Sequence, residues 1–477
     1  MRKEKAKYNK AILPEHQGNP FIEALRPKAS EKVVMDAFSH YPELDEDIRQ
    51  HPDPLVREEY TLRLKTLRQP LLLYYDCFRA IEFALKTGYS AKNPLSPTTA
   101  QLLHYPVDKR PNIEPQTGYF EPKGDSITLI GESGVGKSSL LEQVLNYFPN
   151  VIEHDEYQGT VMEHRNQIVW LKVDCPHNSS VKDLCEEILG ALDLAIGNEL
   201  TKPASTIGKI IRQIEQKIKA NFLGILVIDE MQRLQFKRTG GENNLLNFLH
   251  SLVNKLGVPL FFCANPPFDG TLAKTLKAAR RAESGGYFTM EPLTRDSDGW
   301  DRFVHELWDL HWTNITTELT EELNDKLFEL SVGNLDMAHR IYRDAQKLVI
   351  GSGDERITIS VLEQAHVSAC GLSSKTDEVR QLREKNGLPR RQKATTTKVT
   401  SPYENKKPTS NKKVIGDITR PQHPEFEIQL RELQSAIDIP DRIMDPDLLR
   451  RALDESDPIL YFKDKNILCD DPLEQFD

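Results

Sequence analysis

The sequence predicts an α/β fold in which a parallel β-sheet, covered by helices on both faces, is followed by a purely helical block. Three observations support this fold class. Short apolar, β-rich runs alternate with helical segments in residues 124–293, residues 294–370 show only helical patterns, and a glycine-rich loop, GESGVGKS, follows the first apolar run. Near-continuously apolar strands that alternate with helices are typical of a buried parallel sheet, because the connecting helices cover both of its faces.

Length and composition limit the function classes. A chain of 477 residues predicts two to four domains. Its hydrophobic fraction of 38% lies below the roughly 45–50% of an average globular protein, so part of the chain is expected to lie outside any core. The balance of 62 basic and 72 acidic residues gives a net charge of −10, which argues against a basic protein that coats nucleic acid.

Cysteine usage and hydropathy predict a soluble, cytoplasmic protein. The six cysteines include no C-x-x-C pair, so neither a metal pair nor a disulfide framework is expected. The basic start MRKEKAKYNK is not followed by the apolar stretch of a signal peptide, and no run approaches the roughly 20 apolar residues of a membrane span. We therefore expect no membrane association and a reducing compartment.

Residues 1–123 predict a helical N-terminal appendage or adaptor. Apolar residues recur at three- and four-residue spacing in PLVREEYTLRLKTL (54–67), and more regularly in LLLYYDCFRAIEFALKT (71–87). This spacing places the apolar side chains on one face of a helix. No strand pattern accompanies these two segments.

Residues 124–293 predict the α/β core and residues 294–370 a helical lid. The expected strands are 125–131, 167–174, 224–230 and 258–265, and helices are expected to begin near Lys137, Val181, Ser205 and Asn243. Four amphipathic segments follow at 300–310, 320–330, 337–350 and 360–369. A helical block directly after a parallel-sheet domain commonly packs over it as a lid.

The C-terminal 107 residues predict a basic linker, 371–420, and an acidic tail, 421–477. Residues 385–420 are rich in Thr, Ser, Pro and Lys, and ten basic against two acidic residues give a charge of +8, so this stretch is predicted to be disordered. In the tail, 15 acidic and 6 basic residues give −9 and alternate with Ile, Leu and Phe. This composition predicts either a segment that folds when it binds a basic partner, or a flexible tail without a partner.

The loop GESGVGKS fits the phosphate-loop pattern G-x-x-x-x-G-K-[ST], with a strand before it and a helix after it. Its glycines let successive N–H groups point at phosphate oxygens, above the positive end of the following helix. Lys137 would neutralise the β- and γ-phosphates, and the Ser138 hydroxyl would hold Mg²⁺. The residues predicted to bind ATP here are Gly131, Ser133, Gly134, Val135, Gly136, Lys137, Ser138 and Ser139.

A second motif, ILVIDE, ends the strand predicted at 224–230. Buried carboxylates need a partner, and Mg-ATP would supply one. Asp229 would hold Mg²⁺ through its water shell, and Glu230 would polarise the attacking water as general base; an ordinary strand that ends in solvated acids is the alternative. Asp229 follows Lys137 by 92 residues, an interval that contains a whole extra strand, and no guanine-specifying N/T-K-x-D is found. These features favour ATP over GTP.

Three further sites are predicted with alternatives. Asn265, at the carboxyl end of VPLFFCAN, would be a sensor of the γ-phosphate or simply open the turn before Pro266. Arg281, favoured over Arg280, would be an arginine finger supplied to a neighbouring subunit, or part of a solvated basic helix face. In the lid, either Arg340 or Arg343 would reach the phosphates as a second sensor, or both are surface charges.

Five segments extend beyond the general ATPase motifs: NPFIEALRP (19–27), VWLKVDCPHNSSVKDLC (169–185), GILVIDEMQRL (224–234), LLNFLHSLVNKLGVP (245–259) and GNLDMAHRIYRDAQ (333–346). With these segments the chain resembles the AAA+ ATPases that regulate transposition, the TnsC and TniB group, and TnsC most of all. The similarity runs from about Asn19 to Cys370. One difference from the family lies at the fourth strand, where Cys263-Ala264-Asn265 replaces a frequent Gly-Thr step.

The resemblance implies an ATPase that assembles as a ring or helical filament on duplex DNA without sequence specificity and uses hydrolysis as a switch. It implies a target-selector partner for residues 1–123, and transposase and endonuclease subunits as partners of residues 421–477. Lys182, Lys237 and Arg238 are candidates to contact DNA phosphates in the ring channel, although solvated surface is the alternative for each. The rival class is an oligomerising signalling or initiator-type AAA+ ATPase with no role in transposition.

Overall fold

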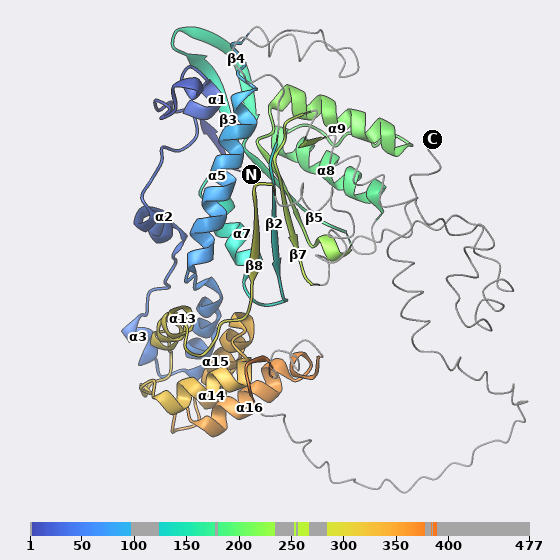
Figure 1. Cartoon of the computed structure of the whole chain (residues 1–477). Coiled ribbons are helices and arrows are strands. Elements are labelled where there is room, and N and C mark those ends of the chain that lie inside the picture. The colour runs from blue at the N-terminus through green and yellow to red at the C-terminus, as the bar shows by residue number, and fades with distance from the viewer. Residues whose placement is uncertain are drawn as a thin grey trace, which may run out of the picture. The chain divides into compact units, whose positions relative to one another are not determined.

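The computed structural model describes residues 2–96, 124–176, 180–233, 252–253, 256–266, 284–376, 383 and 385–388. All of them belong to the first of two units, Met1–Gln392. The predicted α/β core and the helical lid after it are both confirmed (Figure 1). The C-terminal half of the predicted linker and the whole acidic tail lie outside the described residues, as does the helix expected near Asn243.

The core is a five-stranded parallel sheet with the order β5-β6-β7-β2-β8. Since the strands are parallel, all of their carboxyl ends lie at one edge, and β7 separates the strand that leads into the phosphate loop from the strand that ends in Asp229. The strands are β2 (Ser126–Gly131), β5 (Trp170–Asp174), β6 (Ile225–Asp229), β7 (Leu260–Ala264) and β8 (Gly286–Met290).

Alternate side chains of the same strands enter two different apolar layers. Leu226 and Ile228 of β6 pack with helices α8 (Val181–Ile196) and α9 (Ile207–Asn221). Ile225 and Val227 face the other way, toward α5 (Leu72–Ser90) and α7 (Lys137–Asn146). Figure 1 shows these two helix pairs on opposite sides of the sheet. The period-two alternation of a strand explains why the run ILVI before Asp229 is apolar and buried on both faces.

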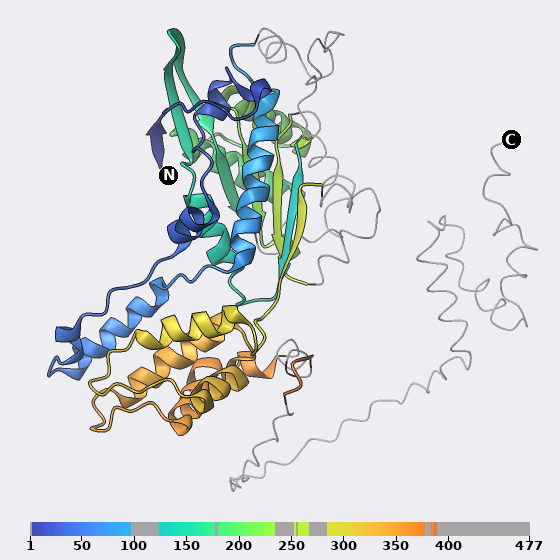
Figure 2. The same cartoon turned by 60° about the vertical axis from the view of Figure 1, so that its left-hand side comes forward.

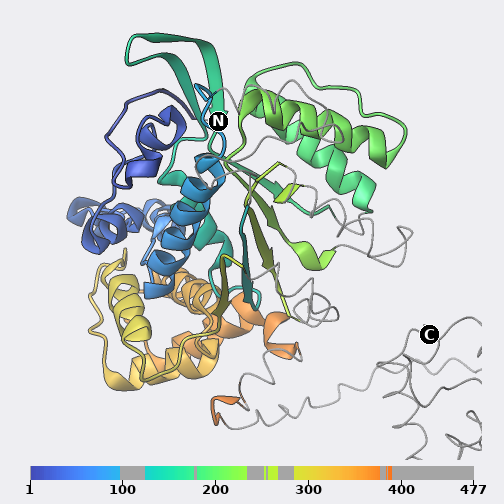
Figure 3. The ribbon, with the colours of Figure 1, turned by 45° about the horizontal axis from the view of Figure 1, so that its top comes forward.

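A second, three-stranded sheet was not predicted. It contains β1 (Lys3–Lys5), β3 (Val151–Tyr157) and β4 (Thr160–Ile168) in the order β1-β3-β4. Gln158 and Gly159, both at positive φ, turn β3 into β4, as in tight hairpins. Figure 3 shows this hairpin standing apart from the main sheet. The single strand predicted at 167–174 is therefore wrong in detail, because β4 ends at Ile168 and β5 begins at Trp170.

Four helices form the lid, within two residues of the predicted positions. They are α13 (Asp298–Asp309), α14 (Glu321–Ser331), α15 (Leu335–Val349) and α16 (Ile359–Cys370). Each begins after a residue whose side-chain oxygen accepts a hydrogen bond from the first turn, which satisfies an otherwise unpaired N–H group. These capping residues are Ser297, Thr320, Asn334 and Thr358.

The N-terminal region is divided between the core and the lid. Its helices α1 (Pro20–Glu23) and α2 (Glu31–Phe38), together with α5, contribute to the apolar layer beneath the sheet. The next stretch, with α3 (Glu46–Arg49), α4 (Pro54–Tyr60) and the 3₁₀ helix η2 (Thr61–Thr66), lies along the lid helices instead (Figure 2). There Leu64 and Leu67 are buried in the apolar cluster of the lid. The predicted boundary at residue 123 remains a prediction.

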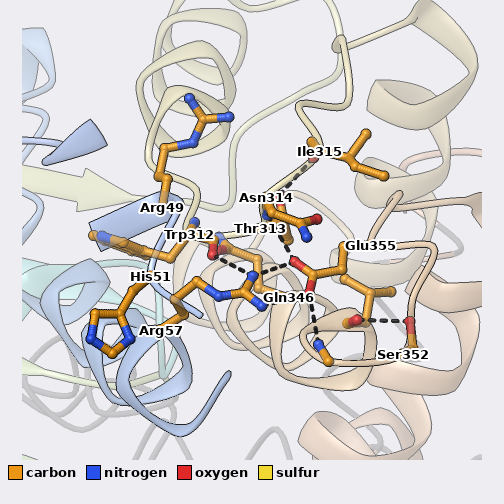
Figure 4. Close-up of polar contacts among 12 residues, drawn as sticks. Arg49, His51, Arg57, Trp312, Thr313, Asn314, Ile315, Gln346, Ser352 and Glu355 are labelled. Carbon is orange, nitrogen blue, oxygen red and sulfur yellow. Dashed lines mark hydrogen bonds and ion pairs between the residues drawn. The ribbon is translucent and has the colours of Figure 1, made fainter. Parts of the chain in front are cut away.

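A buried ion pair fastens this stretch to the lid (Figure 4). Arg57 donates through both terminal nitrogens to the two carboxylate oxygens of Glu355, and the two side chains are only 5% and 2% exposed. The same carboxylate accepts hydrogen bonds from the N–H groups of Asn314 and Gly351, both at 2.8 Å. Although burial raises the pKa of Glu355, these donors outweigh it and hold that pKa below its usual value.

The chain passes between core and lid at three places, 39–45, 68–71 and 291–297. His40 of the first crossing pairs through backbone hydrogen bonds with Arg68 of the second. A Cβ placed on Gly299, at the start of α13, would lie 3.3 Å from Leu71 of the second crossing and 3.5 Å from Leu293 of the third. Leu293 also donates its N–H to the carbonyl of Gly333 at 3.0 Å, in the turn between α14 and α15. The crossings therefore lie side by side at one end of the lid.

Among the described residues, no helix is both long enough and apolar enough to cross a membrane. The described cysteines are buried and free. They are Cys77, Cys175, Cys185, Cys263 and Cys370.

Candidate functional site

The phosphate loop joins β2 to α7 at the carboxyl edge of the sheet. Gly134 and Gly136 have φ values of +82° and +106°, which L-residues rarely adopt, so the glycines of the motif are needed for the loop conformation. Lys137 Nζ donates to the carbonyl oxygens of Gly131 at 2.8 Å and Glu132 at 2.6 Å. The ammonium group is thereby held over the loop, where the sequence motif expects phosphate.

The lid contacts this loop directly, which the sequence analysis missed. Asn334 Nδ2 donates to the carbonyl of Ser133 at 2.8 Å, and the N–H of Asp336 donates to the carbonyl of Gly134 at 3.1 Å. A Cβ on Gly134 would lie 2.7 Å from Asn334 Oδ1. These bonds use loop carbonyls, whereas phosphate binding uses loop N–H groups, so both can exist together. The signal in the sequence was the Gly-Asn pair before α15.

Asp229, at the end of β6, is 4% exposed and has a lysine partner. Lys172 of the neighbouring strand β5 places Nζ 3.1 Å from Asp229 Oδ2, and it also pairs with Asp174 at 2.5 Å. Burial lowers the pKa of Lys172, but the two carboxylates outweigh this and the pKa is raised. Sequence reasoning expected Mg-ATP to be the partner of Asp229 and overlooked Lys172, two positions before the end of an adjacent strand.

A thiol completes the surroundings of Asp229. Cys263 of β7 is fully buried, and burial together with the charge of Asp229 and a hydrogen bond to it raises the pKa of the thiol well above its usual value. The thiol therefore stays protonated. Burial also lowers the pKa of Lys137, although Asp229 and Glu230 act in the opposite direction. That coupling shows that the lysine of the loop and the two acids of β6 share one electrostatic environment.

Glu230 follows β6 in a left-handed backbone conformation, with φ +58°. Its carboxylate Oε2 accepts a hydrogen bond from Gln232 Nε2 at 2.8 Å and lies 3.1 Å from Arg233 Nε. Gln232 Oε1 in turn accepts the backbone N–H of Asn265 at 3.0 Å. Asn265, the predicted sensor, is therefore connected to Glu230 through its backbone N–H and the side chain of Gln232.

Residues 123–272 match the sequence profile of the AAA domain family. With the phosphate loop, the Asp-Glu pair after β6 and the sheet order already described, this match identifies the domain. This part of the chain is a P-loop ATPase domain with the AAA+ fold.

The chain is also similar to several solved structures, at low sequence identity. The Orc1 protein of Aeropyrum pernix in complex with DNA is 15% identical (TM-score 0.37), and the match covers 52% of this chain and 60% of that one. Cdc6p of Pyrobaculum aerophilum is 11% identical (TM-score 0.37), and the match covers 72% of this chain and 90% of that one. A Walker-type ATPase of Pyrococcus abyssi is 16% identical (TM-score 0.35), and the match covers 55% of this chain and 71% of that one. The ATPase thus spans about three fifths of the Orc1 chain. Comparison with curated proteins gives no match.

The ATPase provides donors that suit Mg-ATP. Ser138 is exposed in the first turn of α7, and Asp229 lies at the carboxyl end of β6, so a hydroxyl and a carboxylate oxygen occur at the same edge of the sheet. Such hard oxygen donors, few in number, suit a Mg²⁺ ion that keeps several waters and binds mainly through nucleotide phosphates.

The structure gives contacts for three of the other predicted residues, Arg340, Arg343 and Lys182. Arg340 turns toward α16, because its guanidinium pairs with Asp336 at 2.9 Å and donates to the carbonyl of Ala369 at 2.9 Å. Arg343 pairs with Asp344 at 2.7 Å, and Lys182 lies on α8 with Glu186 as its ion-pair partner at 3.4 Å. The remaining predicted residues, Lys237, Arg238, Arg280 and Arg281, lie outside the described residues.

Proposed function

We propose that this ATPase is a regulator of DNA transposition similar to TnsC. It would bind Mg-ATP between subunits, assemble as a ring or helical filament on duplex DNA, and couple target selection to recruitment of the transposase. The resemblance of segments outside the general ATPase motifs carries the proposal. In addition, Pro20–Glu23 forms α1 beneath the sheet, Gln232 contacts Glu230, and Asn334 contacts the phosphate loop. Three of the segments that resemble TnsC, 19–27, 224–234 and 333–346, therefore contribute residues to the core or to the candidate site. This supports the use of these segments as evidence for the family.

Within this proposal the parts of the chain take different partners. The N-terminal region would receive the target selector, and the acidic tail, with a charge of −9, would bind transposase and endonuclease subunits. The basic stretch 385–420, with a charge of +8, would neutralise DNA phosphates together with Lys182, Lys237 and Arg238. Arg281 or its neighbour Arg280 would reach the nucleotide of the next subunit.

In the site, Lys137 would stabilise the charge on the transferred phosphoryl group and Glu230 would accept a proton from the attacking water. Asp229 and Ser138 would hold Mg²⁺, whose chemical contribution is to neutralise charge on the phosphate oxygens. Lys172 would act earlier, as the group that balances Asp229 before nucleotide arrives. Hydrolysis would limit the lifetime of the DNA-bound assembly and so act as a switch.

Filter binding to random duplex DNA tests the proposal. We expect DNA retention with ATP or a non-hydrolysable analogue, little retention with ADP, and a steep loss as salt rises. A signalling ATPase that oligomerises on a protein ligand would show no nucleotide-dependent, salt-sensitive retention, and that result would refute the DNA-binding part. An initiator-type ATPase would retain DNA but would not stimulate strand transfer by a cognate transposase in a reconstituted reaction.

The Glu230→Gln variant tests the hydrolytic switch. It should bind ATP as the parent does and prolong the DNA-bound assembly, because binding is intact while the proton acceptor is lost. Glu187→Gln, an exposed acid on α8, is the matched control and should behave as the parent. Equal lifetimes for Glu230→Gln and the parent would remove Glu230 from the catalytic role.

A further inference from the structure

The turn that follows β6 needs an external constraint. Glu230 adopts φ +58°, and a left-handed conformation costs a non-glycine residue roughly 1–2 kcal/mol. The short helix η4 (Met231–Arg233) follows at once, and Met231 is 1% exposed, so its buried side chain fixes the turn at one side. Strained residues of this kind persist where the surrounding contacts hold them, and they concentrate at functional sites.

Gln232 supplies a contact at the other side. The two ends of its side-chain amide are used differently: Nε2 donates to Glu230 Oε2 at 2.8 Å, and Oε1 accepts the N–H of Asn265 at 3.0 Å. One planar group thus joins the acid after β6 to the main chain at the end of β7. A glutamate could accept but not donate, and a lysine could donate but not accept, so this double contact suits an amide, which does both.

Both polar contacts of the Glu230 side chain fall on the same oxygen. Within the described residues, Gln232 Nε2 and Arg233 Nε approach Oε2, at 2.8 and 3.1 Å. The side chain of Arg233 is 33% exposed, so solvent screens its ion pair and the pair alone is a weak constraint. Gln232 is tied to β7 and is the better-defined partner. The arrangement leaves Oε1 as the oxygen that can take a proton.

We propose that Gln232 is a positioning residue for hydrolysis, which orients the Glu230 carboxylate and ties it to the end of β7. The inference rests on the proposed role of Glu230 as general base. Since β7 is hydrogen-bonded to β2, which leads into the phosphate loop, the contact also links the base to the strand beside the bound phosphates. A base must lie within hydrogen-bond reach of the water that it activates, so the loss of this link affects the chemical step rather than nucleotide binding.

The test compares Gln232→Met, which removes both contacts at similar volume, and Gln232→Glu, which keeps only the acceptor. We expect both variants to reduce single-turnover ATP hydrolysis by about tenfold to a hundredfold. The dissociation constant of a fluorescent ATP analogue should change by less than about twofold, since the amide does not contact the loop. Gln364→Met on α16, whose exposed amide donates to its helix neighbour Ser360 at 3.4 Å, is the control and should leave both quantities unchanged.

A double-mutant cycle separates positioning from a general structural effect. In the Glu230→Gln background, where the base is already lost, Gln232→Met should reduce the residual hydrolysis no further. A further loss equal to that in the parent would overturn the inference, as would a parental hydrolysis rate for Gln232→Met beside an inactive Glu230→Gln. A parental rate for Glu230→Gln would instead overturn the role of Glu230 itself. If Gln232→Met does not fold, Gln232→Asn, too short to span both partners, replaces it and should show the same loss.

Discussion

Replacing Arg57 with methionine should loosen the stretch 46–67 from the lid. The side chains of Arg57 and Glu355 are 5% and 2% exposed, so solvent cannot replace the lost partner. Removing one member of a buried ion pair typically destabilises a protein by about 3–5 kcal/mol, because the other charge stays buried without compensation. Two backbone N–H groups still hold Glu355, which places our expectation near the lower end, at about 3 kcal/mol.

Tryptophan fluorescence during urea unfolding provides the assay. Three of the four tryptophans of the chain lie in the lid, and Trp312 is fully buried beside the ion pair, where its carbonyl accepts from Arg57 Nη1 at 3.5 Å. Arg356→Met is the matched control, because that side chain is 65% exposed and its pair with Asp354, at 3.7 Å, should contribute under about 1 kcal/mol. Equal losses of unfolding free energy in both variants would refute the reasoning.

The same ion pair predicts a dependence on pH. Because the pKa of Glu355 is lowered in the folded protein, its contribution to stability is complete above the pKa of an unfolded glutamate, about 4.3, and is lost as pH falls through the folded pKa. The difference in unfolding free energy between the parent and Arg57→Met should therefore be largest near neutral pH and shrink on acidification, as Glu355 becomes protonated. A difference that grows on acidification would contradict the assigned ion pair.

Two further substitutions test the lid contact and the site. Gly333→Ala should destabilise the protein by at least about 2 kcal/mol in urea unfolding, because φ is +73° and its Cβ would lie 1.9 Å from the carbonyl oxygen of Leu293. Gly353→Ala, at φ +94° with open space around it, should cost only the backbone strain, about 1–2 kcal/mol, and equal losses would contradict the steric argument. Lys172→Met should lower the Mg²⁺ concentration that half-saturates ATP binding by about twofold to fivefold, because the Lys172 ammonium group then no longer competes with Mg²⁺ for Asp229. Lys182→Met is its control, and an unchanged or raised Mg²⁺ requirement would refute the prediction.

Local periodicity and capping were enough to predict the lid. Its helices have strong 3.6-residue patterns, each preceded by Ser, Thr or Asn, and these signals depend only on neighbouring residues. The phosphate loop and the Asp-Glu pair were predictable for the same reason. Each is a short motif whose chemistry requires particular residue types next to a strand end.

Features that depend on distant segments were not predictable. The run 167–174 reads as one strand because Val169, where the chain leaves one sheet for the other, is itself fully buried and apolar. Lys172 meets Asp229 only because β5 and β6 pair in the register that aligns Asp174 with Asp229. Likewise, the contact between Gln232 and Asn265 joins positions 33 apart in sequence, and no local pattern indicates it.

The three crossings, at 39–45, 68–71 and 291–297, limit how the lid can move. A segment attached by one strand of chain can swing in any direction, whereas adjacent attachments favour rotation about the line that joins them. The pairing of His40 with Arg68 holds the first two crossings together, and Gly299 packs between the second and the third. Asn334 follows Gly333, which packs on the third crossing, and so lies close to that line. We therefore expect its contact with the phosphate loop to survive a small rotation of the lid, while lid residues farther from the crossings travel farther.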